Sequence, residues 1–219
     1  MRTRVKVCCI GSLEEARLAV ALGADALGLV SAMPSGPGPI PDEDIAEIAA
    51  NTPPAVASFL LTSRTAPRAV VEHVRRCRTS VVQLVDTVPP GTYVALRKHC
   101  PAVKIVQVIH VEDEVSLTLA QEASTHADAL LLDSGRPGAR VPELGGTGRV
   151  HDWSLSASIV QASSVPVFLA GGLTPDNVGQ ALAQVRPFGL DLCSGVRTAG
   201  ALDDAKLGRL MDEVRGAAP

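Results

Sequence analysis

The chain has 219 residues, which suits one domain of the α/β-barrel kind and is enough to bury a substantial core. Hydrophobic residues make up 46% but aromatic residues only 2%, so the core is aliphatic, as parallel strands buried on both faces require. The net charge of −3 comes without a basic tract, and no apolar run reaches the roughly 18 residues of a membrane span. We therefore expect one domain over residues 1–219, with neither nucleic acid nor a membrane as a partner.

The five cysteines favour a reducing compartment. Their number is odd, their spacings match no zinc motif, and Cys8 and Cys9 are adjacent and so poorly placed to bridge each other. The first residues, MRTRVKVCCIGS, lack the apolar stretch of a signal peptide. We expect a cytoplasmic protein with reduced thiols and no metal, present as a monomer or a homodimer.

Short β-branched runs alternate with helical patterns along the whole chain. Ser12 is the expected N-cap of the first helix, with Glu15 three residues on as a capping box requires. Asp42 opens the second helix, and Thr174–Pro175 predicts a cap and first turn for the seventh. The strands are expected at 5–10, 25–31, 55–61, 80–85, 103–109, 128–133, 165–170 and 188–193.

Eight strand–helix units predict a parallel sheet, which at this length closes into a (β/α)8 TIM barrel. The alternative is a doubly wound open sheet, which would usually carry a GxGxxG turn after an early strand, and the chain has none. Three long connections, 32–41, 134–150 and 194–202, follow strands on the carboxyl side, where barrel active sites lie.

Glycines after the seventh and eighth strands predict a phosphate site. Gly171 and Gly172 lie in AGGLTPDN, and Ser194 and Gly195 lie in SGVRTAG. Barrel enzymes commonly bind phosphate between these two loops and a helix N-terminus, and glycine lets backbone N–H groups approach the anion. The alternative is that these glycines only form tight turns.

Two side chains at strand tips are candidates for acid–base chemistry. Alternation gives Asp133 and Leu131 one face of the sixth strand, where Asp133 is either a general acid or base or a cap for the next loop. In the first strand, Lys6 and Cys8 share one face, and Cys9 is expected on the other. Cys8 is either a catalytic thiol or a small buried hydrophobe.

Other polar residues carry weaker expectations. Lys6 inside the barrel suits Schiff-base chemistry or an inner polar layer. Cys193 is expected in the core, and His73 in a solvated helical stretch. His110, at the tip of the fifth strand, is placed to face the site.

Several segments, in order and spacing, make the chain resemble the phosphoribosylanthranilate isomerases of tryptophan biosynthesis. They are KVCCI, GADALGLV, VQL, LLLDS, GGTGRVHDW, PVFLAGGLTPDNV and DLCSGVR. The resemblance implies an Amadori rearrangement of an aminoaldose to an aminoketose without metal or cofactor, with Cys8 as general base and Asp133 as general acid. It places the phosphate of a phosphorylated sugar-type substrate at Gly171, Gly172, Ser194 and Gly195.

The chain departs from the family pattern mainly around the aryl group of the substrate. Cys9 replaces the glycine of the family's KICG motif. Gly36–Pro37–Gly38 stands where an SPR motif carries the arginine that meets the anthranilate carboxylate, and Gly38 takes that arginine's place. The family's QLHG appears as QLVD, which keeps Gln83 but has no histidine.

The loop after the sixth strand is longer than in the family and supplies the expected replacement. It carries Arg136 and Arg140, one of which we expect to meet the carboxylate, with Arg64 as a further candidate. Gln83 and Gly146 are expected to contact the substrate as well.

Two other functions remain open from the sequence. One is an isomerase or epimerase of another phosphorylated sugar, and the other is a non-catalytic barrel that binds a phosphometabolite. The Cys8 and Asp133 pair favours an enzyme, whereas the missing arginine favours these alternatives.

Overall fold

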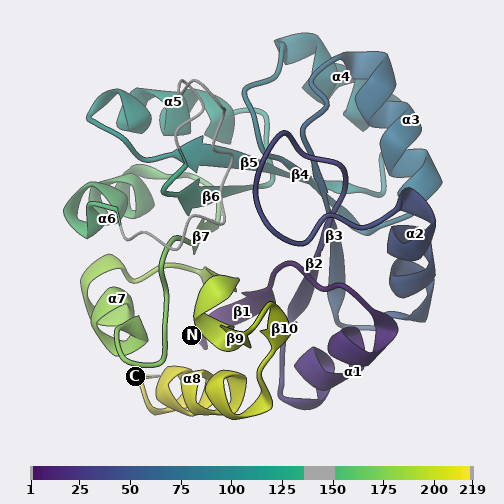
Figure 1. Cartoon of the computed structure of the whole chain (residues 1–219). Coiled ribbons are helices and arrows are strands. Elements are labelled where there is room, and N and C mark those ends of the chain that lie inside the picture. Colours follow the sequence, from purple (N-terminus) through teal and green to yellow (C-terminus); the bar gives the residue numbers. More distant parts are fainter. Residues whose placement is uncertain (1, 136–150, 218–219) are drawn as a thin grey trace.

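The computed structural model of the chain describes residues 2–135 and 151–217. Eight parallel strands form a closed barrel in chain order, with helices around it (Figure 1). The closed sheet confirms the (β/α)8 prediction and excludes the open doubly wound sheet. The strands are β1 (Arg4–Val7), β2 (Ala26–Val30), β3 (Ala57–Thr62), β4 (Val81–Leu84), β5 (Lys104–His110), β6 (Ala129–Asp133), β7 (Val167–Leu169) and β8 (Gly189–Leu192).

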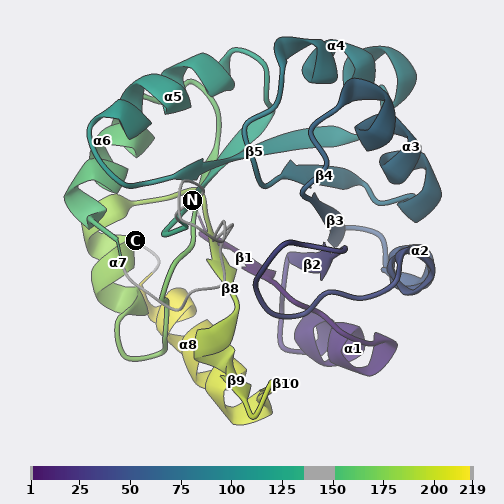
Figure 2. The same ribbon diagram turned by 45° about the horizontal axis from the view of Figure 1, so that its top comes forward.

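The helices lie outside the strands, which the tilted view shows from the side (Figure 2). A 3-10 turn, η1 (Ser194–Val196), and a short hairpin, β9 (Arg197–Thr198) and β10 (Ala201–Leu202), lead from β8 to the last helix. No helix in the described ranges is long and apolar enough to cross a membrane. The helices are α1 (Leu13–Ala21), α2 (Asp42–Asn51), α3 (Pro67–Cys77), α4 (Pro90–His99), α5 (Val115–Ser124), α6 (Trp153–Ala162), α7 (Val178–Val185) and α8 (Asp204–Gly216).

Side-chain caps mark the starts of three helices, α1, α6 and α8. Ser12 caps α1 by accepting a hydrogen bond from the Glu15 backbone N–H at 3.2 Å, as predicted. The prediction that the seventh helix begins at Pro175 is wrong. The Asn177 side chain accepts from the Thr174 N–H at 2.8 Å, which closes a turn before α7 begins at Val178.

Two apolar clusters hold the barrel. The larger lies between strands and helices, and the smaller fills the barrel interior with side chains such as Val30, Phe59 and Leu131. Inside the barrel, Lys6 and Asp191 form a buried ion pair with Nζ and Oδ1 2.8 Å apart. This pair supports the inner polar layer and leaves the Schiff-base interpretation of Lys6 without support.

The barrel closes where its first and last strands meet. β1 pairs with β8 in parallel, with Val7 opposite Leu192, and the Cys8 N–H continues the ladder by donating to the Leu192 carbonyl at 2.7 Å. The carboxyl ends of β1 and β8 therefore lie side by side at the face where the long connections emerge.

Candidate active site

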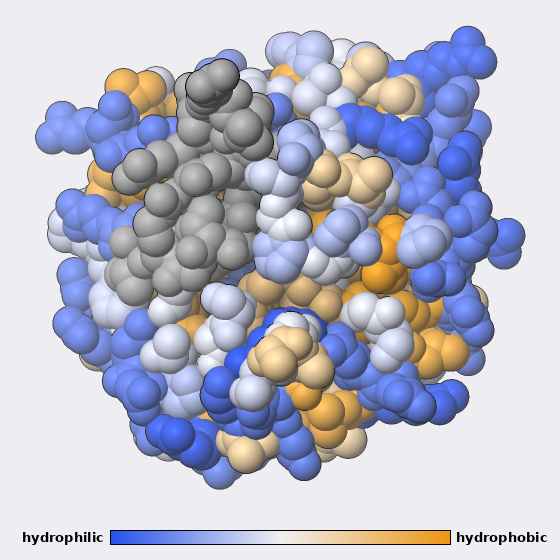
Figure 3. Space-filling view, in the orientation of Figure 1, coloured by the Kyte–Doolittle hydropathy of each residue, from blue (hydrophilic) through white to orange (hydrophobic). Residues whose placement is uncertain are grey.

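One pocket at the carboxyl end of the barrel gathers most of the predicted site residues that the structure describes. The pocket is open to solvent and is lined by both polar and apolar residues. Strongly hydrophilic residues lie around the periphery of this face, and weakly hydrophilic and hydrophobic residues gather towards its middle (Figure 3). Predicted residues that line the pocket are Cys8, Gln83, Asp133, Gly171, Gly172, Ser194 and Gly195.

The loops after β7 and β8 pack directly on each other. A Cβ at Gly195 would lie 1.9 Å from the Leu173 carbonyl oxygen, so only glycine permits this approach. Gly171 and Gly172 have φ of 86° and 62°, in the left-handed region that favours glycine. Both interpretations of these glycines therefore hold: they form tight turns, and they also bring backbone to the pocket wall.

The same two loops offer donors to an anion. Among the described residues, the backbone N–H groups of Gly171, Gly172 and Gly195 have no hydrogen-bond acceptor. The Asn177 amide donates to the Gly172 carbonyl at 2.9 Å and fixes the first loop. Free N–H groups on a restrained loop are what a phosphate site needs.

Asp133 ends β6 at the pocket and is half-buried. Its Oδ1 accepts from the Ser134 N–H at 2.7 Å, which is the loop cap that the sequence left open as an alternative. The cap fixes the carboxyl group at the strand tip, and the group still lines the pocket, so capping and acid–base chemistry are compatible here.

Cys8 points into the barrel beside Lys6, as alternation predicts. A Cβ added to Gly28 on the neighbouring strand would lie 2.9 Å from both Cys8 Sγ and Lys6 Nζ. The thiol is 6% exposed, yet it lines the pocket. The side chain therefore occupies the floor of the site near the start of the chain.

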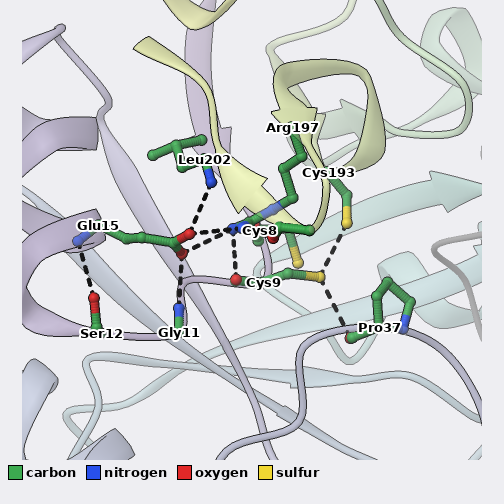
Figure 4. Close-up of polar contacts among 10 residues, drawn as sticks. Cys8, Cys9, Gly11, Ser12, Glu15, Pro37, Cys193, Arg197 and Leu202 are labelled. Atoms are coloured by element: carbon green, nitrogen blue, oxygen red, sulfur yellow. Dashed lines mark hydrogen bonds and ion pairs between the residues drawn. The ribbon is translucent and has the colours of Figure 1, made fainter.

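The prediction that Cys9 turns away from this face is wrong. β1 ends at Val7, and Cys9 has a left-handed φ of 61°, so alternation stops before it. Its Sγ lies 3.0 Å from Cys193 Sγ and donates to the Pro37 carbonyl at 3.5 Å (Figure 4). Glycine, which the family pattern has here, would adopt this backbone without steric cost.

Cys193 lies at the pocket and not in the core position that the sequence predicted. It is half-buried and lines the pocket next to Ser194, whereas we expected it in the core. Asp191, two positions earlier on the same face of β8, lines the pocket too and was missed. An acidic residue inside an otherwise apolar strand was the signal that pointed to it.

Arg197 and Glu15 hold the end of β1 in place, and the sequence did not single them out for this role. Arg197 Nη1 lies 2.8 Å from Glu15 Oε1, and Nη2 donates to the Cys8 carbonyl at 3.2 Å (Figure 4). Glu15 also accepts from the backbone N–H groups of Gly11 and Leu202. Burial alone would raise the pKa of Glu15, but the hydrogen bond from Arg197 and these amides lower it overall.

The Lys6–Asp191 pair supplies charge beneath the pocket. Burial opposes the charged form of Lys6, but the carboxylate of Asp191 outweighs it and raises the pKa of Lys6 above its ordinary value. Lys6 is thus a buried cation paired with Asp191, and its Nζ lies 5.3 Å from the centre of the Phe59 ring.

Gln83 presents an unused acceptor to the pocket. The side chain is 3% exposed, and its Oε1 has no hydrogen-bond partner among the described residues. A buried polar atom without a partner costs stability unless a ligand satisfies it. This is independent support for the expectation that Gln83 contacts the substrate.

Gly38 packs against Cys9, which joins two departures from the family pattern. Gly38 has a φ of 78°, and a Cβ there would lie 2.6 Å from the Cβ of Cys9. Any side chain at position 38, the family's arginine included, would collide with Cys9 in this backbone conformation. The side chain at position 9 thus explains the absence of one at position 38.

Some predicted residues do not reach the pocket or cannot be assessed. Arg136, Arg140 and Gly146 lie outside the described residues. Arg64 is directed to Asp42, with Nη2 3.9 Å from Oδ2, and does not line the pocket. The ring of His110 is turned to the Val85 carbonyl, 2.9 Å away, and is not among the lining residues.

His73 is buried, in contrast to the solvated position that we expected. Its ring lies 2.9 Å from Thr62 Oγ1 and 3.0 Å from Asp42 Oδ1. Together with Cys77, these side chains bring ligand atoms within 4.8 Å of one another. Asp42 also pairs with Arg76, and burial raises the pKa of the Cys77 thiol to about 12, so these side chains form a buried polar network behind the barrel wall.

Comparisons with known proteins agree with this geometry. The family model of N-(5'phosphoribosyl)anthranilate (PRA) isomerase matches residues 5–213. An N-(5'-phosphoribosyl)anthranilate isomerase from Methanocella arvoryzae is 35% identical and covers 97% of this chain and 98% of its own. The crystal structure of phosphoribosyl anthranilate isomerase from Thermus thermophilus has a TM-score of 0.83 at 32% identity, covering 99% of this chain and 100% of that one. A PRAI crystal structure in complex with reduced 1-(o-carboxyphenylamino)-1-deoxyribulose 5-phosphate has a TM-score of 0.79 at 27% identity, covering 98% and 99%.

Proposed function

The chain belongs to the N-(5'-phosphoribosyl)anthranilate isomerase family, and on that premise we propose that Cys8 and Asp133 are its catalytic base and acid. The reaction is the isomerisation of N-(5'-phosphoribosyl)anthranilate in tryptophan biosynthesis, an aldose–ketose rearrangement within one molecule. Family membership sets aside the epimerase and non-catalytic alternatives.

The rearrangement needs an acid and a base that act in turn on one sugar. Asp133 protonates the ribose ring oxygen, the bond from that oxygen to C1′ breaks, and the ring opens to a protonated imine. Cys8 then takes the proton from C2′, which gives an enolamine that becomes the ketone. Only protons are transferred, so side chains suffice for the chemistry.

The arrangement of the strands supports this pair. Cys8 follows β1 and Asp133 ends β6, with β7 and β8 between them around the barrel. Both line the same pocket from different sides of its wall. A sugar held between them would meet the acid on one face and the base on the other.

A single observation carries the assignment of the site residues. Residues on or directly after five separate strands, chosen from the sequence for their chemistry, line one pocket at the carboxyl end of the barrel. We place the phosphate on the backbone of Gly171, Gly172, Ser194 and Gly195. We place Gln83 against a substrate hydroxyl, because its Oε1 is buried and unpartnered among the described residues.

The substrate carboxylate needs a positive partner that residues 36–38 do not supply. An unpaired carboxylate in an enclosed site is costly. We propose that Arg136 or Arg140, from the long connection after β6, meets it, and that Gly146 of the same connection contacts the substrate. Arg64 is not proposed, because it is directed to Asp42.

The experiment that tests the function follows the substrate directly. Purified protein, made in a host that lacks its own isomerase, is mixed with N-(5'-phosphoribosyl)anthranilate, and its anthranilate-type fluorescence is recorded. We expect an enzyme-dependent and saturable loss of fluorescence. The Cys8→Ser/Asp133→Asn double variant, prepared in parallel, is the matched control, and equal rates for both proteins would contradict the assignment.

Two wider properties are proposed on thinner support. The free thiols of all five cysteines suit a cytoplasmic protein, because a reducing compartment keeps them free. We propose a monomer or a homodimer, which sedimentation equilibrium distinguishes.

A further inference from the structure

The pocket mouth holds two thiols whose proximity the isomerisation does not use. Cys9 Sγ and Cys193 Sγ are 3.0 Å apart, and both cysteines line the pocket. A disulfide needs its sulfurs about 2.05 Å apart, so a shift of about 1 Å closes the bond. The two residues come just after β1 and β8, which are adjacent parallel strands.

The backbone selects Cys9 rather than Cys8 as the partner. Val7 pairs with Leu192, so Cys8 and Cys193 are level across the strands. Cys8, however, points down into the barrel towards Gly28. The left-handed φ of Cys9 turns its sulfur sideways to Cys193, and its thiol is close enough to donate there or to Pro37.

We propose that Cys9 and Cys193 form a peroxide-sensitive thiol pair whose oxidation to a disulfide reversibly closes down the active site. Cys193 is the thiol that reacts first. It is half-buried at the pocket, and the hydrogen bond from Cys9, with the charges of Arg197 and Lys6, lowers the pKa of its thiol. Cys9, the donor, has its pKa raised by the same bond and by burial.

The oxidant is a hydroperoxide, and the steps balance with hydrogen peroxide. The Cys193 thiolate attacks one peroxide oxygen: an S–O bond forms, the O–O bond breaks, and the leaving hydroxide takes a proton and departs as water. Cys9 then attacks the Cys193 sulfur: an S–S bond forms, the S–O bond breaks, and a second water leaves. Two thiols and one peroxide become one disulfide and two waters, with two electrons passing from sulfur to oxygen.

The disulfide would act on both halves of the proposed site. Cys9 directly follows Cys8, and Cys193 directly precedes Ser194 of the phosphate loop. Drawing the sulfurs together shifts both neighbours, and oxidation removes the one thiol proton that Cys9 can donate to Cys193 or to the Pro37 carbonyl. Misplacing reacting groups by about 1 Å can cost about 100-fold in rate.

The chemical test is independent of the proposed function. Wild-type protein is treated with hydrogen peroxide, its remaining thiols are alkylated, and peptides are mapped by mass spectrometry. We expect a link between the peptides that contain residues 9 and 193 in wild type, in Cys8→Ser and in the control Cys100→Ala, but not in Cys9→Ser or Cys193→Ser. A link that persists in Cys9→Ser, or oxygen added to one cysteine without any link, would overturn the proposal.

The regulatory part rests on the proposed function and has its own readout. Oxidised wild type should lose about tenfold or more of its kcat/KM, and dithiothreitol should restore it. A cross-linked protein with unchanged activity would overturn the switch while leaving the thiol chemistry in place. Reduced protein without any isomerase activity would instead contradict the proposed function, and the cross-linking result would still decide the thiol pair.

Discussion

At the scale of single residues, different contacts hold the proposed acid and the proposed base in place. Asp133 is fixed by the amide of Ser134, and Cys8 is fixed through its own backbone, whose N–H binds Leu192 and whose carbonyl binds Arg197. The Cys8 side chain can therefore be changed without loss of these backbone contacts, and asparagine at position 133 keeps an oxygen that can accept from the Ser134 N–H.

Replacing either group should abolish most of the chemistry and little else. Cys8→Ser and Asp133→Asn should each lower kcat by about 100-fold or more, the usual contribution of a general base or acid. Steady-state kinetics give the effect, and circular dichroism checks that the barrel is intact. Cys100→Ala is the matched control, because this thiol is buried in the apolar cluster between strands and helices and does not line the pocket. Near-normal turnover in either variant would remove that residue from the mechanism.

The phosphate loops can be tested at a glycine that tolerates no side chain. Gly195→Ala puts a Cβ into the Leu173 carbonyl, so the two loops must separate. We expect a rise in KM of about tenfold or more and a matching weakening of inorganic phosphate as a competitive inhibitor, because both depend on the same donors.

The control for that prediction is Gly208→Ala. A Cβ at position 208, in α8, meets nothing within 4 Å, so the change adds a methyl group without moving a loop. If Gly195→Ala and Gly208→Ala bind phosphate equally well, the anion site lies elsewhere.

Loss of an arginine from the long connection should affect KM more than kcat. Alanine at Arg136 or Arg140, whichever meets the carboxylate, should raise KM for the substrate far more than it lowers kcat, because a remote carboxylate contact is mostly uniform binding. Inhibition by anthranilate should become weaker in the same variant, because the inhibitor carries the same carboxylate. An unchanged KM in both single variants and in the double variant would reject the idea.

At the scale of elements, the tip of β1 and the β2–α2 connection are interlocked through Cys9 and Gly38. Gly38→Ala should destabilise the fold, because its Cβ would lie 2.6 Å from the Cβ of Cys9. In the Cys9→Gly background the contacts with the Cys9 side chain disappear, and what remains is the close approach to the Cα of residue 9, at 3.1 Å, and the cost of the left-handed backbone. A double-mutant cycle by urea denaturation should give a coupling of about 1 kcal/mol or more. Additive effects would show that the loop moves aside freely.

Strand alternation predicted the barrel and the inward residues wherever the chain stays in a strand. It failed at Cys9 because a left-handed residue lies outside any strand, and nothing in KVCCI marks that backbone change. It failed at Pro175 because the Asn177 side chain closes a turn that competes with the helix start. Glu15 was recognised only as part of a capping box, and its pairing with Arg197 was missed because it joins residues far apart in sequence, which no local pattern reveals.

At the scale of the whole molecule, the barrel is proposed to be one cooperative unit over residues 1–219. The first and last strands pair with each other, and Glu15 binds both Arg197 and the Leu202 N–H, so the two ends of the chain are held together and the sheet has no free edge. Urea unfolding followed by tryptophan fluorescence and by far-ultraviolet circular dichroism should give coincident single transitions. Two separated transitions would contradict a single domain.

The same seam has a consequence for how the protein is made. The ribosome delivers the chain from its amino end, so β1 emerges first and waits with one unpaired edge until β8 has been synthesised. Cys8 and the phosphate loop, the earliest and latest parts of the proposed site, meet only at that moment. A nascent chain is therefore inactive until translation is almost finished. A premature stop before β8 leaves a fragment with unpaired strand edges, which is prone to aggregation and is a substrate for chaperones and proteases rather than a weakened enzyme.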